Sequence, residues 1–388
     1  MDSAHRHARQ AAVMSGATYP AFANCHSHAF HRALRGRAGG SDFWSWRDGM
    51  YRVAQVLDPD LYFRLARATY AEMALAGIGA VGEFHYLHHD RGGVPYAEPN
   101  AMAEAVIAAA WEVGLRICLL DTCYLRAGFD GEEPAPAQLR FVHPDAEAWA
   151  IGAAELAARH ADNPAVVIGA AIHSVRAVDE ASLSTVASAL PEAPLHVHVS
   201  EQPAENAACL AATGRTPVQL LADAGVWSPR TTAVHATHLS DEDVRTLGNS
   251  GGYVCFCPTT EAELADGIGP SLALRTAGAR LTLGSDSNTV IDMFAEARGL
   301  AMHERLGSGV RDGWSAEALW QAATSDGAAS LGFGGLGGFE LSRSVRTAGA
   351  DEPLWAASAA DVVPPGGLDP DWVRAELEAA IAEVWGRL

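Results

Sequence analysis

The chain has 388 residues, 49% of them hydrophobic, which is enough to form one large core, and its 47 Asp and Glu residues outnumber its 27 Lys and Arg residues. The formal net charge of -20 argues against nucleic acid and against anionic membrane surfaces as partners. Six cysteines without a CxxC pair, the lack of a secretory leader and the lack of an apolar run of about 20 residues favour a reduced, soluble, cytoplasmic protein without a membrane span.

Short apolar runs alternate with alanine-rich helical stretches along the chain. In chain order, the runs that we predict as strands are 21–28, 79–86, 116–124, 165–175, 194–202, 231–239, 251–260 and 279–287. Helices are predicted among them at 58–77, 100–114, 143–160 and 240–251, several of which open with Asp, Ser or Asn and close with Gly. Eight alternations of strand and helix favour a parallel sheet closed as a (β/α)8 TIM-like barrel, with a doubly wound open sheet as the alternative.

The alternation ends near residue 330. The stretch that follows is rich in glycine, and the last segment, 369–388, has apolar residues at helical spacing and reads as a terminal helix. We therefore divide the chain into an N-terminal tail (1–19), a barrel (20–330) and a C-terminal extension with a terminal helix (331–388).

Polar residues gather at the carboxyl ends of the predicted strands, where barrels of this kind build their active sites. These residues are His28, Glu83, His85, His173, His198, Glu201, His235 and Asp286. Histidines in other places, namely His5, His7, His143, His160 and His303, are assigned to solvent.

Two strands carry histidines in an HxH pattern. Residues i and i+2 of a strand point to the same side, so His26 and His28 of "NCHSHAFHR" can share one cation. The pattern is weak alone, because "HRH" at 5–7 has the same spacing without a strand around it. In "HVHVSEQ" we interpret His196 as a core residue, and His198 as a ligand followed by the carboxylate of Glu201.

Two further segments complete the candidate site. Asp286 ends the strand before "GSDSN", where it could bind a metal or merely cap the next helix. In "VHATH", His235 is expected to face inward, and His238 is interpreted as structural. Three neutral imidazoles and one carboxylate suit Zn2+, or Fe2+ in some proteins, with a position left for a water that the metal turns into a hydroxide nucleophile. A glutamate that is not a ligand can then move protons to a leaving nitrogen.

The order HxH, HxxE, His and SD along residues 20 to about 330 resembles the mononuclear deaminases of the amidohydrolase superfamily. Within that superfamily the chain is most similar to the formimidoylglutamate deiminases of histidine degradation. The stretches that carry this resemblance are "NCHSHAFHRALRG", "FWSWRDGMYRVA", "GEFHYLHH", "HSVRAV", "HVHVSEQ" and "CPTTEAELADGIGPS".

The resemblance implies an amidohydrolase barrel with one zinc ion per chain, which hydrolyses N-formimino-L-glutamate to N-formyl-L-glutamate and ammonia. It implies that His26, His28, His198 and Asp286 are metal ligands, and that Glu201, His235 and Asp286 are catalytic. It implies that Arg52, Tyr86, His173, Arg176 and His31 bind substrate. A substrate with two carboxylates needs fixed cations, and two arginines could each bind one carboxylate bidentately, although either could instead form a surface salt bridge.

Three features differ from the usual pattern of that family. His31 stands where glutamine is usual, Asn288 stands where histidine is common, and the small β domain is expected to be reduced or missing. Two alternatives therefore stay open: another deaminase of the superfamily that acts on a purine or a cyclic amidine, and a metal-binding descendant without catalysis. We expect a small substrate with carboxylates and a homodimer.

Overall fold

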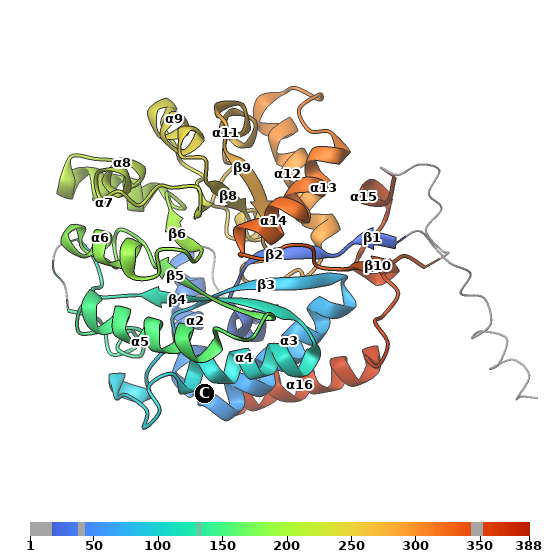
Figure 1. Cartoon of the computed structure of the whole chain (residues 1–388), viewed down its shortest axis with the longest axis horizontal. Coiled ribbons are helices and arrows are strands. Elements are labelled where there is room, and N and C mark those ends of the chain that lie inside the picture. Colours follow the sequence, from blue (N-terminus) through green and yellow to red (C-terminus); the bar gives the residue numbers. More distant parts are fainter. Residues whose placement is uncertain (1–17, 38–42, 130, 132, 343–351) are drawn as a thin grey trace, which may run out of the picture.

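The structure, a computed structural model, describes residues 18–37, 43–129, 131, 133–342 and 352–388. Eight parallel strands form one sheet, in which spatial order follows chain order (Figure 1). The strands are β2 (Phe22–Ser27), β3 (Ile78–His85), β4 (Arg116–Cys123), β5 (Val166–Ile172), β6 (Leu195–Val199), β7 (Thr231–His235), β8 (Tyr253–Phe256) and β9 (Arg280–Leu283). A bridge between Ser27 and Asp286 brings the end of β2 to the loop after β9, so the sheet is nearly closed. The expected barrel is confirmed.

Helices surround the sheet (Figure 1). They are α2 (Phe43–Val56), α3 (Pro59–Leu75), α4 (Ala101–Val113), α5 (Ala146–His160), α6 (Glu180–Ala189), α7 (Pro203–Thr213), α8 (Pro217–Asp223), α9 (Asp241–Asn249), α10 (Pro258–Glu263), α11 (Ser271–Ala277), α12 (Met293–Ser308), α13 (Ala316–Ala323), α14 (Ser325–Ser330), α15 (Glu352–Ala356) and α16 (Pro370–Gly386). The side chains of Asp58, Asp145 and Ser240 accept hydrogen bonds from backbone N–H groups in the first turns of α3, α5 and α9. These capping residues explain why the helices begin where the sequence predicts.

An aromatic cluster packs around Phe22 at the start of β2. Phe22 stacks on Trp320 with ring centroids 5.5 Å apart and meets Phe294 edge to face at 4.9 Å. Because Phe294 belongs to α12 and Trp320 to α13, the start of β2 is fixed to the last helices of the barrel. The carboxyl end of β2, which carries His26, is thereby held at the other end of the barrel.

A small antiparallel sheet pairs β1 (Thr18–Pro20) with β10 (Gly338–Glu340). It joins the two ends of the barrel segment, and β1 and β10 lie side by side in Figure 1. The described residues contain this two-stranded sheet in place of a larger β domain, as expected. The division of the chain at residues 20 and 330 stays a prediction.

Three histidines that were expected in solvent are partly buried. The ring of His143 packs on that of His88 with centroids 4.4 Å apart, the Nε2 atom of His160 lies 3.0 Å from the Glu104 carboxylate, and His303 is half-buried on α12. This expectation was wrong because local sequence does not reveal which loop or helix covers a side chain. His5 and His7 lie outside the described residues.

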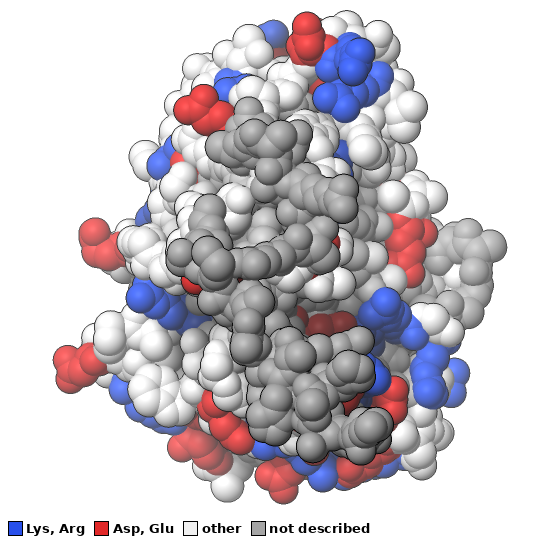
Figure 2. Space-filling view, turned by 90° about the vertical axis from the view of Figure 1, so that its right-hand side faces the viewer, with Lys and Arg blue, Asp and Glu red and all other residues white. Residues whose placement is uncertain are grey.

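Charges of both signs mix on the molecular face in Figure 2, where Arg side chains lie among Asp and Glu side chains. All six cysteines are buried as free thiols, as their apolar surroundings in the sequence predict. Within the described ranges, we find no helix with the length and apolarity that crossing a membrane requires.

Candidate active site

The four expected ligands converge at the carboxyl end of the barrel. The Nε2 atoms of His26 and His198 lie 3.0 Å apart. The Oδ1 atom of Asp286 lies 3.3 Å from Nε2 of His26 and 3.4 Å from Nε2 of His28. Three strand ends, those of β2, β6 and β9, therefore deliver one compact set of three imidazoles and a carboxylate.

Backbone carbonyls orient two of these imidazoles. The Nδ1 atom of His28 lies 3.0 Å from the Phe84 carbonyl oxygen, and Nδ1 of His198 lies 3.0 Å from the His173 carbonyl oxygen. When each Nδ1–H donates to its carbonyl, each Nε2 keeps a free lone pair that points to the cluster. This is the arrangement of histidines that bind a metal.

The ionisation of the cluster also fits a divalent metal. Burial lowers the pKa of His28 and of His198 well below its usual value, so both rings are neutral, as metal ligands must be. Burial opposes the charged form of Asp286, but His26 beside it lowers the pKa of the carboxyl below its usual value. Candidate donor atoms of His26, His28 and His198 lie within 4.8 Å of one another, as do those of His26, His235 and Asp286. A set of His3Asp donors suits Zn2+ or Fe2+.

Strained backbone accompanies the cluster. Ser200, His235, Asp286 and Asn288 have φ angles of 53°, 67°, 45° and 56°, in the left-handed region that non-glycine residues rarely adopt. Such conformations collect at functional sites, where the surrounding structure holds them.

Glu201 and His235 form a pair beside the cluster. The Oε1 atom of Glu201 lies 3.9 Å from Nε2 of His235, and Nδ1 of His235 lies 3.5 Å from Oε1 of the buried Glu261. Burial raises the pKa of Glu201 to about 7, so its carboxyl can gain and lose a proton near neutral pH. Burial opposes charge on His235, but the carboxylates of Glu201 and Glu261 raise its pKa well above the usual value.

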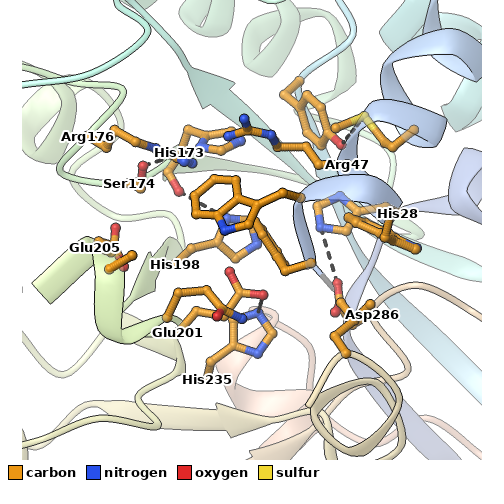
Figure 3. Close-up of a pocket in the computed structure, with 18 of the residues that line it drawn as sticks. His28, Arg47, His173, Ser174, Arg176, His198, Glu201, Glu205, His235 and Asp286 are labelled. Carbon is orange, nitrogen blue, oxygen red and sulfur yellow. Dashed lines mark hydrogen bonds and ion pairs between the residues drawn. The ribbon is translucent and has the colours of Figure 1, made fainter. Parts of the chain in front are cut away.

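A cavity of about 340 Å³ opens at the cluster. His28, His198, Glu201, His235 and Asp286 line it (Figure 3). Aromatic side chains form much of the remaining wall, namely Phe43, Trp44, Trp46, Tyr51, Tyr86, Tyr124, Phe129 and Phe141. The volume is within the range of pockets that bind small molecules.

Two guanidinium groups reach this cavity, those of Arg47 and Arg176 (Figure 3). Both lie close enough to His173 to help lower the pKa of that ring, after the larger effect of burial. Arg47 also lies over the ring of Trp44, 4.5 Å from its centroid. Neither arginine forms an ion pair with another described residue, so both are available to an anionic ligand.

Arg52 does not reach the cavity, contrary to expectation. Its side chain is exposed, whereas Arg47 on the same helix lines the cavity. Five residues of an α-helix turn through about 500°, so positions 47 and 52 lie about 140° apart around α2. Only one of the two can face the barrel, and the structure places Arg47 there.

The other expected substrate residues line the cavity. Tyr86, His173, Arg176 and His31 all belong to its wall. The Nε2 atom of His31 lies 2.8 Å from the Tyr86 hydroxyl. The structure thus brings together these residues and the expected ligands, but not Arg52.

Glu83 and His85 were expected at the same mouth but point away from it. Phe84 faces the barrel interior, where its ring meets that of His198 with centroids 4.2 Å apart. Since neighbouring side chains of a strand point to opposite faces, Glu83 and His85 face the surrounding helices. There the ring of His85 stacks on Tyr62 of α3.

A protein-family model described as "Amidohydrolase family" matches residues 18–341, which is most of the chain. The chain belongs to the amidohydrolase family. It is a hydrolase that acts on carbon–nitrogen bonds.

This amidohydrolase is similar to characterised and solved relatives. It is 36% identical over 337 residues to formimidoylglutamate deiminase of Pseudomonas aeruginosa, an alignment that covers 82% of this chain and 73% of the relative. The crystal structure of an amidohydrolase from Brucella melitensis has a TM-score of 0.86 and 32% identity, over 96% of this chain and 92% of that one. An adenosine deaminase from Xanthomonas campestris with bound zinc has a TM-score of 0.81 over 96% and 86% of the two chains; at 23% identity this likeness shows the fold.

Sequence reasoning missed two residues of the amidohydrolase site. Arg47 lies in "FWSWRDGMY", where aromatic residues at helical spacing could have indicated a helix face turned to a binding site. Glu261 follows Cys257 by four residues in "CPTTE", and its Oε1 atom accepts the Cys257 backbone N–H at 2.8 Å. No pattern in the sequence connects Glu261 with His235, because the contact depends on how β7 and α10 meet.

Proposed function

We propose that the protein hydrolyses N-formimino-L-glutamate to N-formyl-L-glutamate and ammonia, with one divalent metal ion bound by His26, His28, His198 and Asp286. The observation that carries this proposal is the cavity beside this donor set, which the guanidinium groups of Arg47 and Arg176 reach without forming an ion pair with the described residues. A substrate with an amidine and two carboxylates matches that combination. The similarity to formimidoylglutamate deiminase supports it.

Arg47 and Arg176 bind the two carboxylates in this proposal. A guanidinium group can donate two parallel hydrogen bonds to one carboxylate, a charge-assisted contact of the stronger kind. Aromatic side chains around the two arginines exclude water and so strengthen these contacts. The chain's charge of -20 repels anions in general, so local cations are required for an anionic substrate.

Proton transfer is assigned to Glu201. A divalent ion at such a site lowers the pKa of a bound water towards neutrality and so supplies a nucleophile. Glu201 accepts a proton from the attacking water and returns it to the departing nitrogen, so that amidine and water yield amide and ammonia. Its pKa of about 7 lets it serve in both directions. His235, held by Glu261, stabilises the negative charge that develops on the attacking oxygen.

The test of this proposal is ammonia release from N-formimino-L-glutamate by the zinc-loaded protein, with N-formyl-L-glutamate measured as the second product. Both products should appear in equal amounts. Release of ammonia without the formyl product would contradict the proposed reaction.

A second candidate is a deaminase of purines or other cyclic amidines. The aromatic wall of the cavity favours it, because such side chains stack on planar rings. Ammonia release from adenosine and guanine tests this candidate, and turnover of either faster than of N-formimino-L-glutamate would favour it.

A further inference from the structure

The seam between β2 and β9 is the least regular part of the barrel wall. The other neighbouring strands of the sheet pair over several residues, whereas β2 meets the β9 side through the isolated bridge of Ser27 and Asp286. This seam nevertheless carries three of the four proposed metal ligands, His26, His28 and Asp286. Only two backbone hydrogen bonds join these ligands here, from the Asp286 N–H to the His26 carbonyl oxygen at 2.9 Å and from the His28 N–H to the Asp286 carbonyl oxygen at 3.0 Å, so side chains have to supply the rest of the support.

A buried hydrogen-bond network crosses this seam. Its members come from β2, β3 and the loop after β9, and each is fully buried: Asn24, Ser27, Glu83, Ser285 and Asn288. On one side, the Asn24 amide donates to Ser285 Oγ at 2.6 Å, and the Ser285 backbone N–H donates to Asn24 Oδ1 at 2.9 Å. On the other side, Ser27 Oγ and the Ala29 backbone N–H donate to the Glu83 carboxylate at 2.9 and 2.6 Å.

Asn288 joins the two sides. Its Oδ1 atom accepts a hydrogen bond from Ser285 Oγ at 2.6 Å. Its Nδ2 atom donates to Ser27 Oγ at 3.1 Å and to the His28 carbonyl oxygen at 3.0 Å. One amide thus contacts the residue before Asp286, the residue before His28 and His28 itself.

The hydrogen bonds of the network run in one donor-to-acceptor direction. Each serine hydroxyl donates one hydrogen bond and accepts another, and the chain of donors ends at Glu83, whose two oxygens accept from Ser27 Oγ and from the Ala29 backbone N–H. A buried network in which every member is satisfied specifies one arrangement. The left-handed backbone of Asn288, with φ of 56°, is a conformation that asparagine tolerates better than most residues.

We propose that Asn288 is a positioning residue that holds His28 and Asp286 at the separation needed to bind the metal ion. This inference rests on the proposed metal site but not on the proposed substrate. Asn288 does not line the cavity, so it acts through the ligands and not through contact with substrate. Partners of this kind contribute to metal affinity, and their loss typically costs about 10- to 100-fold.

The test uses the full-length protein loaded with Zn2+ or Co2+ and two variants. Asn288→Gly removes the amide and keeps a residue that adopts positive φ freely. Asn288→Asp keeps the shape and an acceptor, but lacks the N–H groups that bond Ser27 and the His28 carbonyl. Its added negative charge would by itself retain a cation, so faster metal release cannot come from the charge. Thr69→Val is the control, because it removes a buried hydrogen bond to the Leu65 carbonyl within α3 and none of the hydrogen bonds of the network.

Both Asn288 variants should release Zn2+ to a chelator at least about ten times faster than the wild type and should shift the visible absorption bands of bound Co2+. Thr69→Val should melt at a lower temperature but release Zn2+ at the wild-type rate. If the Asn288 variants melt earlier with unchanged release and unchanged Co2+ bands, the residue only stabilises the fold and the inference is overturned. Wild-type release from Asn288→Gly would also overturn it, because the amide group would then not matter.

The result of this test can be distinguished from the result of testing the proposed reaction. A wild-type protein that takes up no divalent metal would overturn this inference together with the metal site. A protein that binds the metal but does not hydrolyse N-formimino-L-glutamate would overturn the substrate assignment alone, because metal release and Co2+ absorption do not depend on turnover.

Discussion

Glu201 is the side chain on which proton transfer depends in this account. Glu201→Gln preserves the shape of the side chain but cannot exchange a proton, so turnover should fall by about 10²- to 10⁴-fold. The variant should still bind one equivalent of metal, because Glu201 is not one of the proposed ligands. Steady-state rates and metal analysis of the same preparation test both parts. Turnover above a tenth of the wild-type rate would contradict the role, and loss of the metal would make Glu201 a ligand.

The two arginines of the cavity should determine the preference for a dicarboxylate. Arg47→Met and Arg176→Met each remove a charge-assisted contact and keep most of the volume, so each should raise KM for N-formimino-L-glutamate by about 10- to 100-fold. Turnover of an uncharged formamidine should change little, since its binding does not use these groups.

Arg52→Met is the matched control for Arg47, because it lies exposed on the same helix. It should leave KM unchanged for both substrates. A rise in KM for Arg52→Met equal to that for Arg47→Met would show that overall charge, and not contact in the cavity, attracts the substrate.

At the scale of elements, β2 and the end of β9 lie so close together that Gly284 should tolerate no side chain. A Cβ atom at Gly284 would lie 2.7 Å from the Cβ atom of His26 and 2.8 Å from its backbone nitrogen and oxygen. Gly284→Ala should therefore lower the free energy of unfolding by about 1–3 kcal/mol and weaken metal binding, because the strands must separate where the ligands lie.

The control for this substitution is Gly152→Ala on α5. A Cβ atom there meets no atom within 4 Å, and alanine favours a helix over glycine. This variant should gain about 0.5–1 kcal/mol in the free energy of unfolding. Chemical unfolding of both variants tests the pair, and equal effects of the two substitutions would contradict the packing argument.

The loop after β3 should make the fold sensitive to acid. Burial lowers the pKa of His88 from 6.5 to about 4, and its Nε2 atom lies 2.9 Å from the Thr122 carbonyl oxygen. The unfolded chain binds a proton at His88 more readily than the folded chain does. The contribution of the neutral His88 ring to the free energy of unfolding is therefore fully present above about pH 6.5. It is lost as the pH falls towards about 4, by at most about 3 kcal/mol. In His88→Gln, the free energy of unfolding should therefore fall less between pH 7 and 5 than in the wild type. An identical loss in both proteins would contradict the role of His88.

Much of this architecture could be predicted from the sequence because strands and ligands follow short periods. The apolar runs gave the eight strands, and the i, i+2 spacing of His26 and His28 indicates that both face one side. The inward faces of β3 and α2 could not be predicted. The register of β3 directs Phe84 inward and Glu83 outward, and the rotation of α2 selects Arg47 over Arg52; both depend on packing between distant segments.

At the scale of the whole molecule, metal binding and folding should be coupled. His26, His28, His198 and Asp286 come from the two ends and the middle of the barrel segment, so an ion bound to all four joins β2, β6 and the loop after β9. Removal of the metal should lower the melting temperature, and Zn2+ should restore it at one equivalent per chain. Calorimetry with elemental analysis checks this, and two equivalents per chain would contradict a mononuclear site.

The expected homodimer stays a prediction that sedimentation can test.

We propose that this barrel hydrolyses N-formimino-L-glutamate with a divalent metal. The most direct measurement is the rate of ammonia release from that substrate by one protein preparation, first stripped of metal and then supplied with one equivalent of Zn2+. We expect no release above background without metal, and saturable release, matched by N-formyl-L-glutamate, after one equivalent. Undiminished release by the stripped protein, or no release by the zinc-loaded protein, would contradict this proposal.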